Sequence, residues 1–194
     1  MKLLRMAHNF LSRFTGSGLD LRKEDWEKQY QQGDWDFFKT EENRYQAIAK
    51  WIQAGSVLDL GCGEGWLRRY IPTQVHLTGV DISSFAIEKA RAQFPWSEGN
   101  EWIVGDVSQI EIDQTFSVVL FNESLNYCTH PMEQVARWLK QVAPGGILLL
   151  SLYDCQQNRS ILRQLDKRWP ANQKELIRED EKKFWTLVVI RTSV

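Results

Sequence analysis

The feature that most constrains the fold of this chain is a short apolar run that ends in three alternating glycines. The run occupies residues 57–60, and Gly61, Gly63 and Gly65 follow it. Such a run is typical of a buried parallel strand. Glycine has no Cβ, so the backbone after the strand can turn tightly and lie against a ligand. A helix is expected next, over residues 64–71, and strand, glycine turn and helix together predict the entrance to a nucleotide site.

Length and charge indicate one domain of an ordinary globular protein. The 194 residues are enough to bury one core and hardly enough for two. The formal net charge of −1 gives no general attraction to nucleic acid or to acidic membranes, and no apolar run is long enough to span a bilayer. We therefore expect no nucleic-acid partner and no membrane partner.

The cysteines favour a reducing compartment. The three of them, Cys62, Cys128 and Cys155, are far apart and form no C-x-x-C pair. This pattern argues against a zinc site and against a disulfide framework. We expect a cytoplasmic protein with no metal site.

The first eighteen residues contain no acidic side chain. Leu3, Phe10 and Phe14 fall on one face of a helix, with basic residues among the rest. A transit peptide and a membrane-surface helix have similar patterns. We favour a helix that caps the domain or pairs with another subunit, in a monomer or a homodimer.

From residue 56 onward the sequence alternates between strand and helix patterns, which predicts a parallel sheet covered by helices. The last two β-rich runs are joined by the polar turn 179–183, so they predict an antiparallel hairpin. The expected strands cover 56–60, 76–80, 102–104, 117–121, 147–152, 173–178 and 184–192; the expected helices cover 21–30, 41–53, 64–71, 84–94, 131–142 and 157–168, with a turn at 144–146.

The glycine spacing favours one class of nucleotide site over another. Dinucleotide-binding folds use G-x-G-x-x-G, whereas here Asp59 leads G-x-G-x-G. This motif resembles motif I of the class I (Rossmann-like) S-adenosylmethionine (SAM)-dependent methyltransferases. The terminal hairpin fits that family, because NAD-binding sheets end in a parallel sixth strand. The resemblance implies a three-layer α/β sandwich with a mostly parallel seven-stranded sheet, strand order 3-2-1-4-5-7-6, and an antiparallel last strand.

Acidic residues follow the second and third expected strands. Parallel strands bring their carboxyl ends to one edge of the sheet, where ligands bind in this topology. Asp81 can accept hydrogen bonds from both ribose hydroxyls, with a helix cap as the alternative, and Ile82 can pack on adenine. In the family resembled, the residue matching Asp106 accepts from the adenine amino group, and the neighbouring backbone N–H, that of Val107, serves a ring nitrogen. A simple turn aspartate is the alternative for Asp106.

Aromatic residues gather before the glycine turn. Trp26, Tyr30 and Trp35, with Arg44 beyond them, look like the N-terminal lid of small-molecule methyltransferases. Such lids close over the methionine end of SAM, because a sulfonium is attracted to aromatic faces and a guanidinium holds a carboxylate. The alternative is that the aromatic residues belong to the core and that Arg44 is an exposed helix residue.

The glycine turn supplies the remaining expected contacts to the cofactor. SAM carries no phosphate, so the turn need only let its amino-acid end and its sulfonium lie over bare backbone. The residues of this turn are Asp59, Gly61, Cys62 and Gly63. Cys62 is also explained as a small packing residue.

The segment after the fourth expected strand corresponds to motif IV, where the methyl group leaves. Residues 121–127 resemble the small-molecule branch, including the nodulation-type N-methyltransferases, and lack the Pro-Pro pair of DNA amino-methyltransferases. Asn122 is expected to bond the SAM amino group. Glu123 could take a proton from the acceptor or bind its ammonium group, with a solvated loop carboxylate as the alternative. His130 is a second candidate base.

These features predict an enzyme, a SAM-dependent methyltransferase that moves a methyl group to a nucleophilic N or O of a small molecule. Segment 1–54 is expected to hold N-terminal helices and the lid, and 55–194 the SAM-binding domain, within one compact unit. The lack of an obvious dedicated base favours N-methylation, because a neutral amine needs none. An NAD-linked oxidoreductase and a non-catalytic partner protein that keeps the fold are the alternatives.

Overall fold

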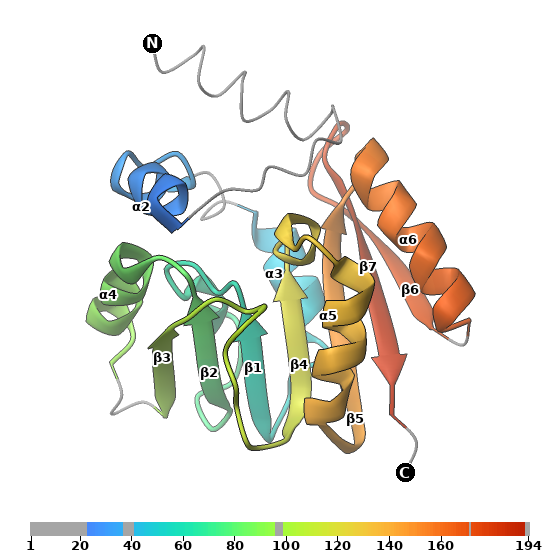
Figure 1. The fold of residues 1–194 in the computed structure, drawn as a ribbon, viewed down its shortest axis with the longest axis horizontal. Coiled ribbons are helices and arrows are strands. Elements are labelled where there is room, and N and C mark those ends of the chain that lie inside the picture. The colour runs from blue at the N-terminus through green and yellow to red at the C-terminus, as the bar shows by residue number, and fades with distance from the viewer. Residues whose placement is uncertain (1–22, 37–40, 96–98, 171, 193–194) are drawn as a thin grey trace.

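The computed structural model describes residues 23–36, 41–95, 99–170 and 172–192 of the chain, so the helix expected within residues 1–18 lies outside the described residues. A seven-stranded sheet runs through the molecule in the order β3-β2-β1-β4-β5-β7-β6, with helices on both faces (Figure 1). The expected three-layer α/β sandwich and its strand order are therefore confirmed.

The strands β1 to β5 pair in parallel, and β7 pairs antiparallel with both β5 and β6. The antiparallel last strand is thus confirmed. The strands are β1 (Ser56–Leu60), β2 (His76–Asp81), β3 (Asn100–Val104), β4 (Phe116–Asn122), β5 (Val142–Tyr153), β6 (Gln173–Arg178) and β7 (Phe184–Arg191). The α-helices are α2 (Lys23–Gln31), α3 (Glu42–Ala49), α4 (Ser84–Gln93), α5 (Pro131–Trp138) and α6 (Gln156–Arg168), and the short 3-10 helices are η2 (Trp66–Arg69), η4 (Leu125–Tyr127) and η5 (Leu139–Gln141).

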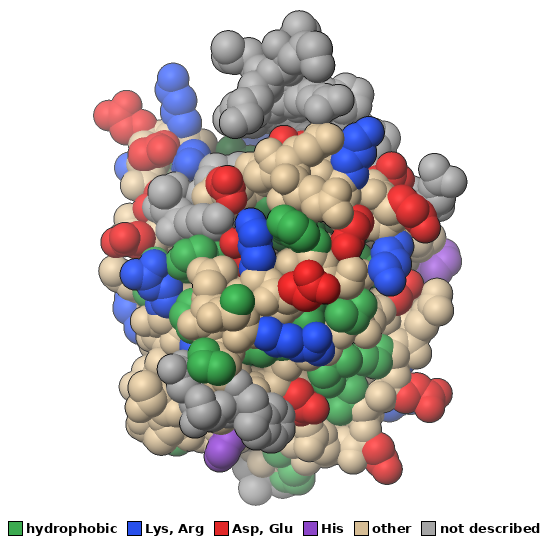
Figure 2. Space-filling view, turned by 90° about the vertical axis from the view of Figure 1, so that its left-hand side faces the viewer, with side chains coloured by type: hydrophobic (Ala, Val, Ile, Leu, Met, Phe, Trp, Pro, Cys, Tyr) green, Lys and Arg blue, Asp and Glu red, His purple; other side chains and the backbone are tan. Residues whose placement is uncertain are grey.

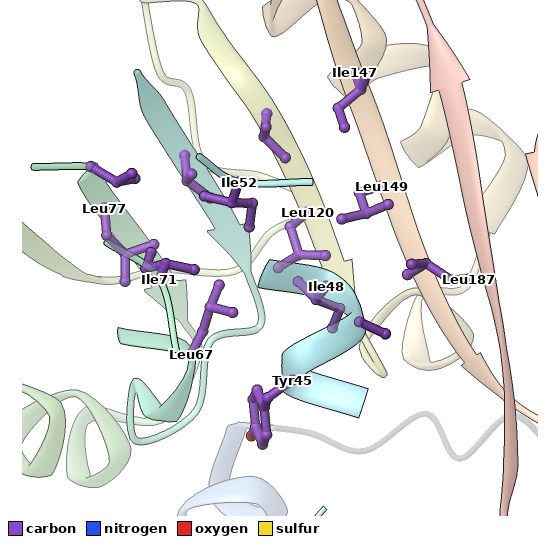
Figure 3. Packing of buried hydrophobic residues seen from close by; sticks show 14 of the residues in the cluster. Tyr45, Ile48, Ile52, Leu67, Ile71, Leu77, Leu120, Ile147, Leu149 and Leu187 are labelled. Carbon is purple, nitrogen blue, oxygen red and sulfur yellow. The ribbon is translucent and has the colours of Figure 1, made fainter. Parts of the chain in front are cut away.

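The core lies on both faces of the sheet, because successive side chains of a strand point to opposite sides. On β4, Leu120 belongs to one buried cluster and Val119 to the other. The first cluster is covered by α3 and α4, and the second by α5 and α6. Figure 3 shows Ile48 of α3 next to Leu120, with Leu149 of β5 beyond it.

The helix expected over residues 64–71 is wrong: only the four-residue 3-10 helix η2 forms there. Gly65 precedes it with φ +78° and provides no side-chain cap. The guanidinium of Arg68 donates hydrogen bonds of 2.8 Å to the backbone carbonyls of Ile71 and Val75, which folds the chain back toward β2. A helix without a cap and with its last residues bound elsewhere does not propagate.

Most other boundaries differ by at most two residues, and three differences are larger. The helix expected to end at residue 53 ends at Ala49, because the chain turns through Gly55 (φ +85°) to enter β1. The turn expected at 144–146 lies inside β5, where the pairing with β4 changes register. The helix expected over 131–142 is α5 followed by η5.

The surface carries both signs of charge. On the face in Figure 2, the coloured Lys and Arg side chains alternate with Asp and Glu side chains, and hydrophobic side chains are scattered between them. Within the described part of the chain, no helix has the length and apolar character needed to cross a bilayer.

Candidate cofactor site

A cavity of about 540 Å³ lies at the carboxyl ends of β1, β2, β3 and β4. Of the fifteen residues predicted for the site, all except Asp59 line it. These are Trp26, Tyr30, Trp35, Arg44, Gly61, Cys62, Gly63, Asp81, Ile82, Asp106, Val107, Asn122, Glu123 and His130. The structure therefore brings together residues that lie more than a hundred positions apart in the sequence, while their roles remain predictions.

Asp81 ends β2 with its carboxylate held by backbone groups. Oδ2 accepts a hydrogen bond from the N–H of Gly63 at 2.8 Å, and Oδ1 accepts from the N–H of Ser83 at 2.9 Å. The Tyr30 side chain also lies near this carboxylate and lowers its pKa. Burial raises the pKa of Asp81 to about 6 against the effect of these bonds. Asp81 is thus a fixed, largely ionised acceptor above that pH, and Ser83, not Asp81, caps α4.

Asp59 lies behind the cavity on β1 and is 1% exposed. Its Oδ1 has no hydrogen-bond partner among the described residues. Burial, and then the charge of Asp81, raise the pKa of Asp59 to about 7. A buried carboxylate oxygen without a hydrogen bond costs free energy. A ligand that donates a hydrogen bond to Asp59 would therefore be stabilised.

The three glycines of the motif have different reasons to be glycine. All three have positive φ. At Gly61 a Cβ would lie 2.5 Å from the Cβ of Ser124, and at Gly63 it would lie 2.9 Å from the Tyr30 hydroxyl. At Gly65 it would lie 2.5 Å from the indole of Trp102. The first two glycines therefore keep the cavity side of the turn open, while the third makes room for a core side chain.

Cys62 sits within the turn, where burial and then the charge of Asp81 raise the pKa of its thiol well above the usual range. The thiol is therefore protonated near neutral pH and is a poor nucleophile. Its Sγ packs against Gly79, because a Cβ added to that glycine would lie only 2.8 Å from the sulfur. This contact fits the packing explanation for Cys62, although the residue also lines the cavity.

The lid aromatic residues pack against each other and against motif IV. Trp26 on α2 stacks on Trp35 with ring centroids 5.4 Å apart, and Tyr30 lies at 6.5 Å from Trp35. The ring of Tyr127 in η4 meets Trp26 edge-on at 4.8 Å. The rings thus join α2 to the loop after β4 across the cavity.

Arg44 is buried in α3 instead of exposed. Its guanidinium forms a 2.9 Å ion pair with Glu41 and a hydrogen bond with the Asn122 side chain, and it lies 4.6 Å from the ring centroid of Tyr45. Burial lowers its pKa, but the neighbouring Tyr45, Glu41 and Glu123 raise the pKa by more than burial lowers it. A permanent positive charge therefore lines the cavity beside Asn122.

Glu123 has an unusual backbone. Its φ is +61°, the only positive value among non-glycine residues in the described ranges. Its N–H donates to the carbonyl of Ser151 at 3.1 Å, which pins the chain as it leaves β4. The side chain is 7% exposed and lines the cavity. A left-handed conformation costs a bulky residue about 1–3 kcal/mol, and such residues cluster at functional sites.

Asp106 and its neighbours form the far side of the cavity after β3. Oδ1 of Asp106 accepts hydrogen bonds from the N–H of Ser108 at 2.8 Å and from its hydroxyl at 2.7 Å. These bonds fit the turn interpretation of Asp106, and they involve only one of its two carboxylate oxygens. The Val107 carbonyl accepts from the indole N–H of Trp138 at 3.2 Å, which fixes the segment on α5.

His130 lies at the rim, exposed, where α5 begins. Its side chain makes no cap hydrogen bond to that helix.

Ten further residues line the cavity but were not among the predicted site residues: Tyr45, Glu64, Trp66, Gly105, Ser108, Ser124, Tyr127, Cys128, Thr129 and Gln134. Ser124 and Tyr127 fall within the motif IV segment and could have been found there, whereas Gln134 carries no sequence signal. Among the residues that the structure describes, no three His, Cys, Asp or Glu side chains are placed to hold a metal ion.

The sheet order, the antiparallel β7 and the acid-bearing cavity at the strand ends define the class I, Rossmann-like methyltransferase fold. The sequence profile of a family described as "Methyltransferase domain" matches residues 57–146. Residues 57–146 are thus similar to the methyltransferase domain of the class I SAM-dependent enzymes, and SAM is the cofactor of that family.

Three comparisons illustrate the range of similar proteins. Malonyl-(acyl-carrier protein) O-methyltransferase of Anoxybacillus flavithermus is 28% identical over 101 residues, which cover 50% of this chain and 39% of that protein. The N-methyltransferase NodS of Bradyrhizobium japonicum, solved with S-adenosylhomocysteine (SAH), has a TM-score of 0.61, 18% identity and coverage of 72% and 79%. The cyclase SpnF has a TM-score of 0.63, 14% identity and coverage of 78% and 82%. The chain thus spans about two fifths of the first relative, and the two structures are alike in fold.

Proposed function

We propose that this chain transfers a methyl group from SAM to a nucleophilic N or O of a small molecule, and that the cavity at the strand ends holds both. The observation that carries the proposal is the convergence on one cavity of Asp81, Arg44 and the open turn Gly61–Gly63, beneath the aromatic lid. Each group is complementary to a different part of SAM.

The residues present fit the cofactor. The volume of about 540 Å³ falls within the roughly 300–1,000 Å³ of small-molecule sites. We propose that Asp81 accepts from the ribose hydroxyls, that Ile82 and Val107 contact the adenine, and that Asp106 accepts from its amino group. In this proposal Arg44 pairs with the carboxylate of SAM.

The amino end of the cofactor would meet the other polar groups of the site. Asn122 provides a side-chain oxygen, already hydrogen-bonded to Arg44, beside the turn of Gly61, Cys62 and Gly63. Asp59 carries an unsatisfied oxygen behind the same turn. A buried negative charge at this point favours an ammonium group. The rings of Trp26, Tyr30 and Trp35 provide faces that attract a sulfonium.

When bound, SAM supplies an activated methyl group on a good leaving group. The protein then has to orient the acceptor and exclude water, and orientation alone contributes about 7–11 kcal/mol in favourable cases. Glu123 is buried at the β4 end and is the stronger candidate to hold the acceptor or to take its proton. His130 is exposed at the rim, so its contribution as a base is expected to be smaller.

The sequence is compatible with two other functions. An NAD-linked oxidoreductase is disfavoured by the antiparallel β7 and by the family match. A protein that keeps the fold without methyl transfer is a real alternative, because SpnF, a cyclase, shares the architecture. The acidic residues and Arg44 in the cavity favour cofactor binding, and turnover separates the two cases.

The test has two stages. Isothermal titration of the whole chain with SAH, and separately with NAD, should give binding for SAH and none for NAD. A panel of amines and hydroxyl compounds, including acyl-carrier-bound acids, is then screened with SAM for SAH release. Binding of NAD instead of SAH would contradict the proposed cofactor, and SAH binding without turnover on any acceptor would favour the non-catalytic alternative.

A further inference from the structure

The lid helix α2 bears one acidic side chain that points away from the cavity, toward α4. Trp26 and Tyr30 line the cavity from α2, and Glu27 lies between them in the sequence. Glu27 Oε2 accepts a hydrogen bond from the Ser83 hydroxyl at 2.5 Å, and Oε1 accepts from the Ser84 hydroxyl at 2.6 Å. The backbone N–H of Phe85 donates to both oxygens, at 3.2 and 3.4 Å.

This carboxylate is well suited to the start of a helix in another part of the chain. The first turn of α4 offers unpaired N–H groups and the positive end of the helix dipole. Burial raises the pKa of Glu27, but the hydrogen bonds from Ser83, Ser84 and Phe85 lower it by more. Glu27 is therefore ionised near neutral pH, and its bonds are of the stronger, charge-assisted kind.

Ser83 connects Glu27 to Asp81, the proposed ribose acceptor. Its side chain is completely buried; the hydroxyl donates to Glu27 and accepts from the N–H of Ala86 at 3.1 Å. The N–H of the same serine donates to Asp81 at 2.9 Å. Tyr30, one turn after Glu27 on α2, lies beside Asp81 in the cavity. Glu27 thus holds the lid to the loop of residues 81–85, and that loop also fixes the proposed ribose acceptor.

We propose that Glu27 is a positioning residue that clamps α2 onto the loop 81–85, so that Trp26 and Tyr30 stay in the cavity and the cofactor meets a lid already in place. The inference rests on the proposed function, because the clamp matters only if the cavity binds SAM. It is separate from that function, since Glu27 itself does not line the cavity. The clamp lowers the cost of ordering the lid when ligand binds.

The test compares Glu27→Ala with Glu27→Gln and with Glu24→Ala in the full chain. Glu24 lies exposed in the same helical turn, so its substitution removes the same charge without touching α4. Hydrogen exchange of the ligand-free protein should become faster over residues 23–31 in Glu27→Ala while β1 and β4 keep their protection. SAH binding should weaken about tenfold or more, because an apparent Kd rises as the binding-competent fraction falls.

The conservative variant separates positioning from general stability. In Glu27→Gln the amide oxygen still accepts from one serine while the amide nitrogen cannot accept, so SAH affinity should be partly restored. Glu24→Ala should match the wild type in exchange and in affinity. Unchanged exchange over α2, or faster exchange with unchanged SAH affinity, would overturn the clamp. A wild-type chain that does not bind SAH would instead remove the proposed function, and the positioning role with it.

Discussion

The two ends of the cavity are built in different ways. At the β2 end, Asp81 continues a regular strand and its carboxylate is fixed by the backbone N–H groups of Gly63 and Ser83. At the β4 end, Glu123 leaves the strand with φ +61° and leads into the short helix η4. The β2 end is thus unstrained and pre-formed, whereas the β4 end keeps a side chain in a costly conformation.

This difference indicates where specificity resides. Every protein that uses the same cofactor can share the regular β2 end, because its geometry follows from strand ends and a glycine turn. A strained residue persists only when the surrounding structure holds it, here through the bond between the Glu123 N–H and Ser151 on β5. We infer that the β4 end is where this chain recognises its own acceptor.

The largest expected effect is at the β2 end. Asp81→Asn removes a charged acceptor, and hydrogen bonds to charged groups contribute about 1.5–3 kcal/mol each. SAH affinity should fall roughly 100-fold, measured by isothermal titration. Asp113→Asn, at an exposed loop position, is the control and should bind as the wild type does. Wild-type affinity in Asp81→Asn would remove the ribose assignment.

The second prediction concerns Gly61, where the two ends touch. Gly61→Ala forces a Cβ to 2.5 Å from the Cβ of Ser124 at φ +79°, and should lower the free energy of unfolding by about 2–4 kcal/mol. Gly99→Ala is matched in φ, at +76°, but its nearest contact is 3.3 Å, so it should cost about 1–2 kcal/mol. Urea denaturation measures both. Equal losses of stability in the two variants would mean that Ser124 moves aside at no cost in free energy.

The third prediction separates strain from chemistry at the β4 end. Glu123→Ala and Glu123→Gly both remove the carboxylate, and only glycine adopts φ +61° freely. Glu123→Gly should be the more stable of the two by about 1 kcal/mol, in urea denaturation. Both should lower turnover while the Kd for SAH stays within about threefold of wild type. A large loss of SAH affinity in either variant would place Glu123 in the cofactor site.

The smallest expected effects are two pH dependences at the β2 end, and the first concerns stability. Burial raises the pKa values of Asp59 to about 7 and of Asp81 to about 6, so the folded chain holds more protons than the unfolded chain between roughly pH 4 and 7. These two acids therefore reduce stability as pH rises through that window. Melting temperatures at pH 5 and pH 8 should show this contribution, and Asp81→Asn should make the difference smaller. An unchanged difference in the variant would contradict the coupling.

SAH binding should depend on pH in the opposite direction. Protonation of Asp81 below about pH 6 removes the charge that the ribose hydroxyls are proposed to meet. SAH affinity should thus decrease as pH falls from 7 to 5, even while the ligand-free chain gains stability from the same groups. Titrations at the two pH values measure the effect, which should be smaller in Asp81→Asn, where Asp59 still titrates.

The sheet could be predicted from the sequence because each strand is a short apolar run followed by a polar turn. β1 begins and ends where the pattern placed it, and the polar turn 179–183 gave the hairpin. The helix after the glycines could not be predicted correctly, because apolar Leu67 and Ile71 are also what a compact turn buries under α3. Periodicity does not separate these cases over so few residues.

Spacing in the sequence predicted which residues of the strand ends line the cavity, but not how Arg44 and Glu123 are held there. Asp81 and Asp106 sit at strand ends, which any parallel sheet brings to one edge. The burial of Arg44 depends on its contact with Asn122, which is distant in the sequence, as well as on the ion pair with Glu41. The sequence around Arg44 does not predict this burial. The positive φ of Glu123 is equally hidden, because glutamate has no preference for it.

The fit between Gly65 and Trp102 has a consequence for any redesign of this scaffold. The indole lies against both Gly65 and Gly79, and its N–H is tied to the Phe94 carbonyl at 2.7 Å. Gly65 of the glycine motif must therefore remain glycine because of Trp102, which lies on the edge strand β3. Shrinking that ring would leave a void against the glycine turn, and adding a methyl group at either glycine would force the ring or the backbone to shift. Engineers who vary the binding loop would have to treat a residue on β3 as part of it.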